Sequence, residues 1–398
     1  MASLSPSQLI RYKPLSHPNS IRLIILEPGL QSQRISCHFL ESSLSSQPYE
    51  ALSYEWGDDV PADMIFLDNI EIKIRRNLHE ALQHLRWEDK HKEIWIDALC
   101  INQDDDEEKG RQVQIMDRIY KEAERVVVWL GVGTDGSDRA MDAIARFYDF
   151  EHYRTWAKGT ATTNEQVLQF IDSLFPVRND LSARITEVVS LAERKYWSRV
   201  WIVQEFHLAR DSTIYCGRKS MTLRTLANFC QTLEALRGRG FQAEGRNTSE
   251  VAQEEMAICQ KGILDICHSK MSWHCTLRAN RTTNHDTRTL NSLLWTLVRS
   301  DFACKKPRDY IYALKGIASD INDGDIQCDY EKDIKEVYRD LLNLFLDRMT
   351  TYTPLSHGEL KYTLCKKMGV SLDRGHEELI EQYQVRQGIQ DTKNLPLT

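Results

Sequence analysis

Two short runs of the sequence hold side chains suited to binding a polar ligand. They lie near residues 55 and 100, and their candidate ligand-binding residues are Tyr54, Trp56, Gly57, Asn102 and Gln103. An indole ring can stack on a ligand, and glycine lets the backbone approach one closely. Side-chain amides donate and accept hydrogen bonds. The same residues also suit a strand-end turn around a core tryptophan, with the amides bonded to their own loop.

Two carboxylates in or after the second run are candidate catalytic groups. Asp97 ends an apolar stretch, and Glu108 lies in the first turn of a predicted helix. A carboxylate can stabilise the oxocarbenium-like sugar that forms when a glycosidic bond breaks. Each acid also has a structural interpretation. Asp97 could accept backbone N–H groups of the following turn, and Glu108 could stabilise the positive end of its helix by about 0.5 kcal/mol.

The elements that must position these residues are predicted from short apolar stretches between turn residues. The predicted strands cover residues 21–26, 34–40, 49–54, 64–67, 70–74, 93–98 and 125–130, the fourth and fifth forming a hairpin. Asn77 is the predicted N-cap of one helix, and the aspartates at 104–106 cap another. The unit 93–131 therefore has the order of a parallel βαβ crossover. Because ligands of such sheets bind beyond the carboxyl ends of the strands, the two runs share one crevice if their strands are parallel neighbours.

The rest of the chain is predicted to be mainly helical. Helices are expected at 191–208, 222–236, 290–298, 310–317 and 334–345, with one strand at 213–216. We divide the chain into a flexible leader (1–20), an α/β domain (21–210, core 45–210), a helical extension (211–348) and a polar tail (349–398). The basic cluster from Lys305 to Arg308 is interpreted as a solvated face.

Composition excludes several classes of protein. The 398 residues carry a formal charge of −7, so the chain has no overall attraction for nucleic acid or an anionic membrane. Its apolar runs are far shorter than the ~20 residues of a spanning helix, and no secretion signal is present. Ten cysteines without a C-x-x-C pair predict reduced thiols and a cytoplasmic protein.

One cofactor signature is missing from the sequence. G-x-x-x-x-G-K-[ST], the P-loop pattern, does not occur, so a nucleotide-driven sensor would be a separate polypeptide. The closest approach to a metal motif is Cys267-His268 with His274-Cys275, whose spacing matches no zinc pattern. We therefore predict no metal site.

Longer motifs around these residues resemble the fungal heterokaryon-incompatibility (HET) domain proteins. The motifs are YEALSYEWG at 49–57, IWIDALCINQ at 94–103 and WSRVWIVQE at 197–205, with a weaker match in PRDYIYAL at 307–314. Glu55 departs from the family, which usually has an apolar residue there, and Lys109 stands where arginine is common.

The resemblance implies a role in non-self recognition that ends in regulated cell death. The family is remotely similar to TIR domains, which implies a doubly wound, mostly parallel sheet. Some TIR domains cleave NAD, so the resemblance also implies an NAD-cleaving enzyme with Glu108 and Asp97 as catalytic residues. Fold kinship alone does not carry activity, and the alternative is a non-catalytic interaction module. We expect a homo-oligomer and a separate sensor protein of the NLR type as partners.

Overall fold

The computed structural model describes residues 10–57, 60–148, 181–237, 250–279, 288–347 and 357–386. In these ranges one sheet runs in the order β5-β4-β2-β1-β6-β3-β7-β8-β9. Its strands are β1 (Ser20–Leu26), β2 (Ser36–Ser43), β3 (Glu50–Tyr54), β4 (Asp63–Leu67), β5 (Ile70–Ile74), β6 (Lys92–Trp95), β7 (Arg125–Trp129), β8 (Ser212–Cys216) and β9 (Lys219–Thr222).

The middle of the sheet is parallel and both margins contain antiparallel pairs. β6, β3, β7 and β8 run parallel to one another, whereas β1 pairs antiparallel with β6 and β2, and β9 pairs antiparallel with β8. β1, whose sequence SIRLIIL is mainly apolar, is buried along its whole length. The α/β class is thereby confirmed, with a mixed sheet.

The predicted hairpin at 64–74 is confirmed. β4 and β5 pair antiparallel across Asp68 and Asn69, whose φ angles are 51° and 62°. Two consecutive positive φ angles define the type I′ turn, which Asp and Asn tolerate better than other non-glycine residues.

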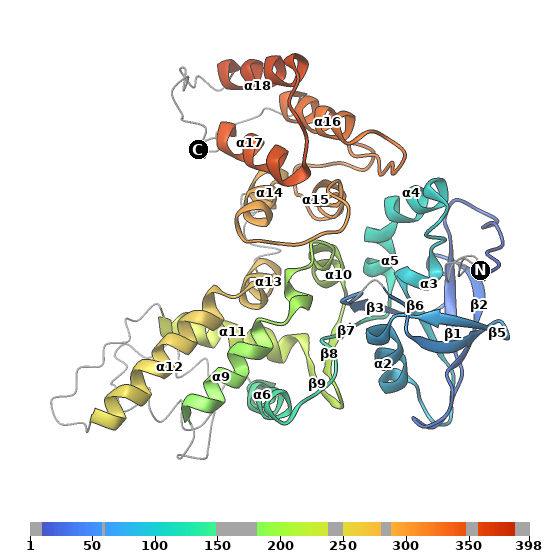
Figure 1. Ribbon diagram of the computed structural model, residues 1–398, viewed down its shortest axis with the longest axis vertical. Helices are drawn as coiled ribbons and strands as arrows, with labels where there is room; N and C mark the ends of the chain where they lie inside the picture. Colours follow the sequence, from blue (N-terminus) through green and yellow to red (C-terminus); the bar gives the residue numbers. More distant parts are fainter. Residues whose placement is uncertain are drawn as a thin grey trace.

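The helices form two groups in Figure 1, with α14–α18 gathered at one end, away from the sheet. The helical segments are α2 (Arg76–Leu85), α3 (Asp97–Cys100), α4 (Asp106–Gln114), α5 (Met116–Glu122), α6 (Asp135–Ala145), η1 (Arg146–Tyr148), α9 (Leu181–Ala192), η3 (Lys195–Ser198), α10 (Ile202–Leu208), α11 (Leu223–Arg237), α12 (Glu250–His268), α13 (Lys270–Ala279), α14 (Leu290–Arg299), α15 (Asp309–Tyr312), α16 (Ile334–Asp347), α17 (His357–Met368) and α18 (Arg374–Arg386).

β3 and β6 are parallel neighbours, as the shared crevice requires. Glu50 lies beside Ile94 and Ala51 beside Trp95, so the carboxyl ends of both strands point the same way. The crossover from β6 to β7 consists of α3, α4 and α5, and β3 lies between the two strands that it joins. The runs near residues 55 and 100 consequently leave the sheet at one edge.

The predicted helix at 191–208 is wrong. α9 ends at Ala192, and α10 begins only at Ile202. Between them Arg199 is extended (φ −73°, ψ 135°) and forms a parallel bridge with Ala303. The Ala303 N–H donates to the Ser198 carbonyl at 2.7 Å, and the Val200 N–H donates to the Ala303 carbonyl at 3.0 Å. This long-range backbone pairing replaces the local helical bonds that the apolar pattern predicts.

Smaller differences also occur. α2 begins at Arg76, so Asn77 is inside the helix and does not cap it; its side chain donates to the Glu55 carbonyl and accepts from Trp129 Nε1 at 2.9 Å. The helix predicted at 310–317 extends only over Asp309–Tyr312. β9 is absent from the predicted elements, and the segment after residue 349, predicted only as a polar tail, includes α17 and α18.

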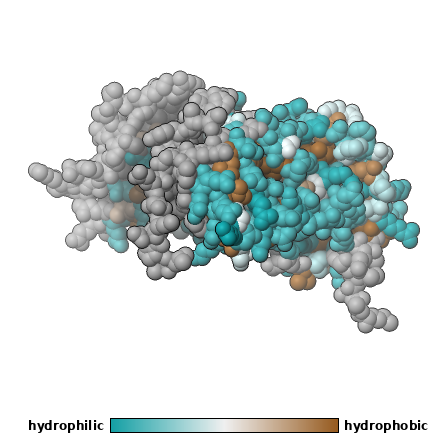
Figure 2. Space-filling view, turned by 90° about the horizontal axis from the view of Figure 1, so that it is seen from above, coloured by the Kyte–Doolittle hydropathy of each residue, from teal (hydrophilic) through white to brown (hydrophobic). Residues whose placement is uncertain are grey.

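Two apolar clusters form the core. The first surrounds the sheet, and the second joins α14–α18 to Val113, Val200 and Val203. On the face in Figure 2 the described surface is mainly hydrophilic, with apolar side chains scattered over it. Throughout the described ranges, every helix is too short or too polar to cross a bilayer.

Candidate functional site

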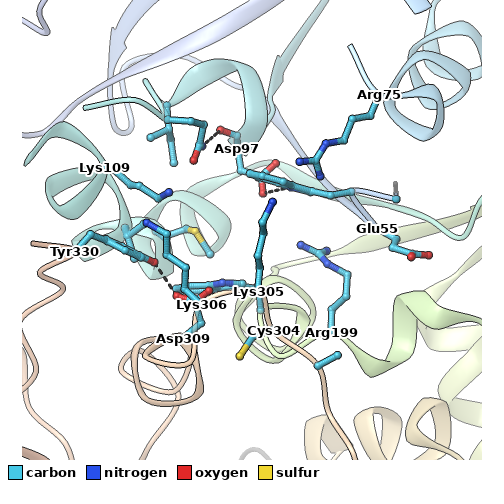
Figure 3. A pocket seen from close by; sticks show the side chains of 18 residues that line it. Glu55, Arg75, Asp97, Lys109, Arg199, Cys304, Lys305, Lys306, Asp309 and Tyr330 are labelled. Atoms are coloured by element: carbon cyan, nitrogen blue, oxygen red, sulfur yellow. Dashed lines mark hydrogen bonds between the residues drawn. The ribbon is translucent and has the colours of Figure 1, made fainter. Parts of the chain in front are cut away.

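A cavity of about 400 Å³ opens beyond the carboxyl ends of β3 and β6. Four separate parts of the chain line it (Figure 3). They contribute Glu55, Trp56, Gly57 and Arg75; Asp97, Ile101, Gln103, Lys109, Val113 and Met116; Arg199 and Trp201; and Ala303, Cys304, Lys305, Lys306, Asp309 and Tyr330. The crevice predicted from the two runs is thus present, and segments much later in the chain complete its wall.

Trp56 and Asp97 join the two runs directly. The indole Nε1 donates to Asp97 Oδ2 at 2.8 Å, while Oδ1 accepts from the Ala98 N–H at 2.7 Å. The Arg75 guanidinium lies over the indole ring, 4.7 Å from its centroid. Burial raises the pKa of Asp97, and Arg199 and the Trp56 hydrogen bond oppose that rise. Asp97 thus has both structural partners and a place in the cavity wall.

Of the other predicted binding residues, two line the cavity and two lie outside its lining. Gly57 (φ +71°) and Gln103 line the cavity, and Gln103 Nε2 donates to the Asp97 carbonyl at 3.0 Å. Tyr54 is buried in the core beneath, where burial raises its pKa. Asn102 is outside the lining and donates its backbone N–H to Glu108 Oε1 at 2.8 Å.

Glu108 lies behind the cavity wall in a buried ion pair. Its two carboxylate oxygens contact Arg22 Nη1 at 2.5 Å and Arg22 Nη2 at 2.8 Å, and the residue is 4% exposed. As predicted, an aspartate caps this helix: Asp105 Oδ1 accepts from the Glu108 N–H at 2.9 Å. Glu108 is not one of the residues that line the cavity. It ties β1 and α4 to the loop that carries Asn102 and Gln103.

Arg199 reaches the cavity because the helix is interrupted at this point. Behind it, Glu205 is 1% exposed and lies 3.4 Å from Arg199 Nη1. Ser53 of β3 donates to the Glu205 carboxylate, and the Ser53 and Tyr196 hydroxyls lie 2.7 Å apart. Burial raises the pKa of Glu205 to about 7, although Arg199 opposes the rise. This buried network connects the third motif to the first.

The far wall of the cavity was missed by the sequence reasoning. Lys305 and Lys306 line the cavity, and Lys305 is also exposed, so the cluster predicted to be a solvated face borders the cavity as well. The Tyr330 hydroxyl donates to Asp309 Oδ1 at 2.8 Å, and burial raises the pKa of both groups. The available signal was the pair of adjacent lysines directly before the weakest of the four motifs, which contains Asp309.

Outside the cavity, the cysteine–histidine cluster does not form a metal site. His274 Nδ1 lies 3.1 Å from His207 Nε2, and burial lowers the pKa of His274 to about 3. In the described part of the chain no group of three or more His, Cys, Asp or Glu side chains is placed to hold a metal ion.

Comparison with known proteins places the motifs in a family. Residues 49–205 match the family model described as heterokaryon incompatibility protein (HET). Residues 49–205 thus form a HET domain. This domain supplies the cavity residues from Glu55 to Trp201, whereas the wall from Ala303 to Tyr330 lies beyond the matched range.

One curated relative of this HET domain chain is "Heterokaryon incompatibility protein 6, OR allele" from Neurospora crassa. The two are 32% identical over 242 residues, which cover 54% of this chain and 35% of the relative. The chain therefore spans about a third of the length of that relative. No solved structure matches.

Proposed function

We propose that this HET domain chain acts in heterokaryon incompatibility as a cytoplasmic protein that triggers regulated cell death after non-self contact. The role in incompatibility is supported by the family match and the Neurospora relative. The Trp56–Asp97 hydrogen bond carries the assignment of the site, because it joins the first two motifs at the cavity wall. Arg199 of the third motif lines the same cavity.

Overexpression in a fungal host tests the proposal. Asp97→Asn removes the charge in the cavity while keeping the side-chain shape, and Asp104→Asn is the matched control because Asp104 is exposed. We expect Asp97→Asn to abolish killing and the control to kill like the wild type. Far-UV circular dichroism and protein abundance establish that the variants are folded. Full killing by a folded Asp97→Asn variant would refute the assigned site.

A second candidate function is NAD hydrolysis, as in some TIR domains. In that reaction water replaces nicotinamide on the ribose carbon, giving ADP-ribose, nicotinamide and a proton. Asp97 supports this candidate because it is a carboxylate in the cavity wall beyond two parallel strands. Both oxygens of Glu108, the other predicted acid, are engaged by Arg22, which favours a positioning role for that residue. A doubly wound, TIR-like ancestry of the sheet belongs to the same proposal.

Nicotinamide release from NAD separates this candidate from a non-catalytic module. Purified protein that releases nicotinamide, with the rate lost in Asp97→Asn, would support hydrolysis. Killing without any release would support signalling by homo-oligomerisation or by a separate NLR-type sensor.

A further inference from the structure

Two lysines from distant parts of the chain converge at one end of the cavity. Lys109 is on α4, Lys306 precedes α15, and Figure 3 shows both side chains directed to the same region. Both ammonium groups lie over the Tyr330 ring, 4.9 Å and 4.6 Å from its centroid. Their convergence on one ring brings two positive charges together.

Like charges in a partly buried place repel each other. Burial and Lys306 together lower the pKa of Lys109 to about 8, although Asp309 and Asp106 oppose the shift. Asp309, whose carboxylate also accepts from the Tyr330 hydroxyl and the Trp201 side chain, does not fully offset the repulsion, because the pKa of Lys109 stays lowered beside it. Asp106 lies 3.6 Å from Lys306. An anion between the two lysines would relieve the repulsion.

The rest of the cavity favours an anion with an organic body. Five cationic and three carboxylate side chains line it, an excess of positive charge in a chain whose net charge is −7. Ile101, Val113 and Met116 add apolar wall, and Trp56 adds an aromatic ring. A volume of about 400 Å³ lies within the range of small-molecule sites.

We infer that the Lys109–Lys306 end of the cavity binds the diphosphate of a nucleoside diphosphate-containing metabolite. The phosphates lie between the two lysines, and the nucleoside contacts the apolar and aromatic wall. This inference deepens the proposed function and rests on it, because it names the ligand class of the same cavity. Charge-assisted hydrogen bonds from ammonium groups to phosphate are the strong contacts of such a site.

Isothermal titration calorimetry of the full chain with ADP and with inorganic pyrophosphate tests the inference. We expect both probes to bind, ADP the more tightly because of its nucleoside. Lys109→Gln/Lys306→Gln should weaken ADP binding at least tenfold and reduce its dependence on salt. Lys121→Gln, an exposed lysine outside the cavity, is the matched control and should change the affinity less than twofold. Absence of ADP binding, or equal binding by the double variant, would overturn the inference.

Amine acylation of the wild type provides a measurement that needs no variant. ADP should slow the modification of Lys109 and Lys306 at least fivefold, measured by mass spectrometry, and leave Lys121 unaffected. Equal modification with and without ADP would overturn the inference.

The two proposals fail separately. Loss of killing in Asp97→Asn without ADP binding by the wild type would keep the proposed function and overturn the diphosphate site. ADP binding that depends on both lysines, combined with full killing by Asp97→Asn, would keep the diphosphate site and refute the role assigned to Asp97.

Discussion

Arg22 and Glu108 form a buried ion pair that has a structural role. The Arg22 guanidinium also donates to the Cys100 carbonyl at 3.1 Å and to the Lys13 carbonyl at 2.6 Å. One buried cation thus connects the backbone at Lys13, the end of α3 and the start of α4. Breaking one partner of such a buried pair leaves the other without its counter-charge.

Glu108→Gln should therefore lower the free energy of unfolding by about 3 to 5 kcal/mol, because Arg22 stays charged and buried. Urea denaturation measures the change. Glu107→Gln is the neighbouring control, since that side chain is exposed and its ion pair with Arg111 contributes little. Equal unfolding midpoints for the two variants would contradict the role given to Glu108.

Glu205 predicts a pH dependence of stability. Burial raises its folded-state pKa to about 7 from the ordinary 4.5. Between these values the folded protein binds more protons than the unfolded chain, so the free energy of unfolding falls as the pH rises. The fall ends above about pH 7 and is on the order of 3 kcal/mol.

Glu205→Gln should lack that fall. The difference in unfolding free energy between wild type and variant, measured at pH 5 and pH 8, should change by about 2 to 3 kcal/mol. Other titrating groups are common to both proteins and cancel. A difference that stays constant between pH 5 and pH 8 would contradict a folded-state pKa of about 7 for Glu205.

At the scale of elements, α4 positions the segment that leads to Tyr330 in the cavity wall. Gln114 Oε1 accepts from the Cys328 N–H at 2.8 Å, and Gln114 Nε2 donates to the Ile326 carbonyl at 3.2 Å. Gly110 lets the helix approach this segment closely, because a Cβ there would lie 2.7 Å from the Cys328 carbonyl oxygen. Tyr330 follows two residues later and enters the cavity.

Gly110→Ala should push the Cys328 backbone away and lower the free energy of unfolding by about 1 to 3 kcal/mol. Gly136→Ala on α6 is the matched control, because its Cβ would meet only the Glu187 side chain at 3.4 Å. That change should be neutral or slightly stabilising. Thermal unfolding compares the two, and equal melting temperatures would contradict the close contact.

The sequence predicted elements best where local pattern and tertiary structure agree. The strands at 49–54, 93–98 and 125–130 have apolar stretches buried in the sheet, and each was found within a few residues. The helix at 191–208 failed because Arg199 pairs with a residue about a hundred positions later. No local signal reports such a partner.

The part of the candidate site at the strand ends could be predicted from the sequence, whereas the part formed by the helical segments could not. Trp56, Gly57, Asp97 and Gln103 follow from strand-end geometry and line the cavity. Lys306 and Tyr330 depend on how the helical part packs on the sheet, which periodicity does not encode. Glu108 has the predicted place on its helix, but its partner Arg22 is 86 residues away and could not be identified from spacing.

At the scale of the whole molecule, Trp201 lies where the two apolar clusters meet. It packs against both the cluster around the sheet and the cluster of α14–α18, and it lines the cavity. Side chains shared by two cores make their unfolding cooperative. The cavity therefore depends on the coupling of the two parts.

Trp201→Ala should remove that coupling. We expect the free energy of unfolding to fall by about 2 to 4 kcal/mol and scanning calorimetry to show two transitions in place of one. Trp87→Ala is the control, because Trp87 is 39% exposed. A single transition at the wild-type temperature would show that Trp201 does not link the clusters.

The order in which the cavity walls are synthesised has a consequence for the cell. A ribosome that has completed residue 205 has made the whole segment matched by the family model, yet Lys306 and Tyr330 are still untranslated. Domains fold as they emerge from the ribosome, but this cavity can close only after Tyr330 is available. A premature stop codon upstream of that tyrosine would yield a fragment without this wall, so the cavity forms only late in synthesis.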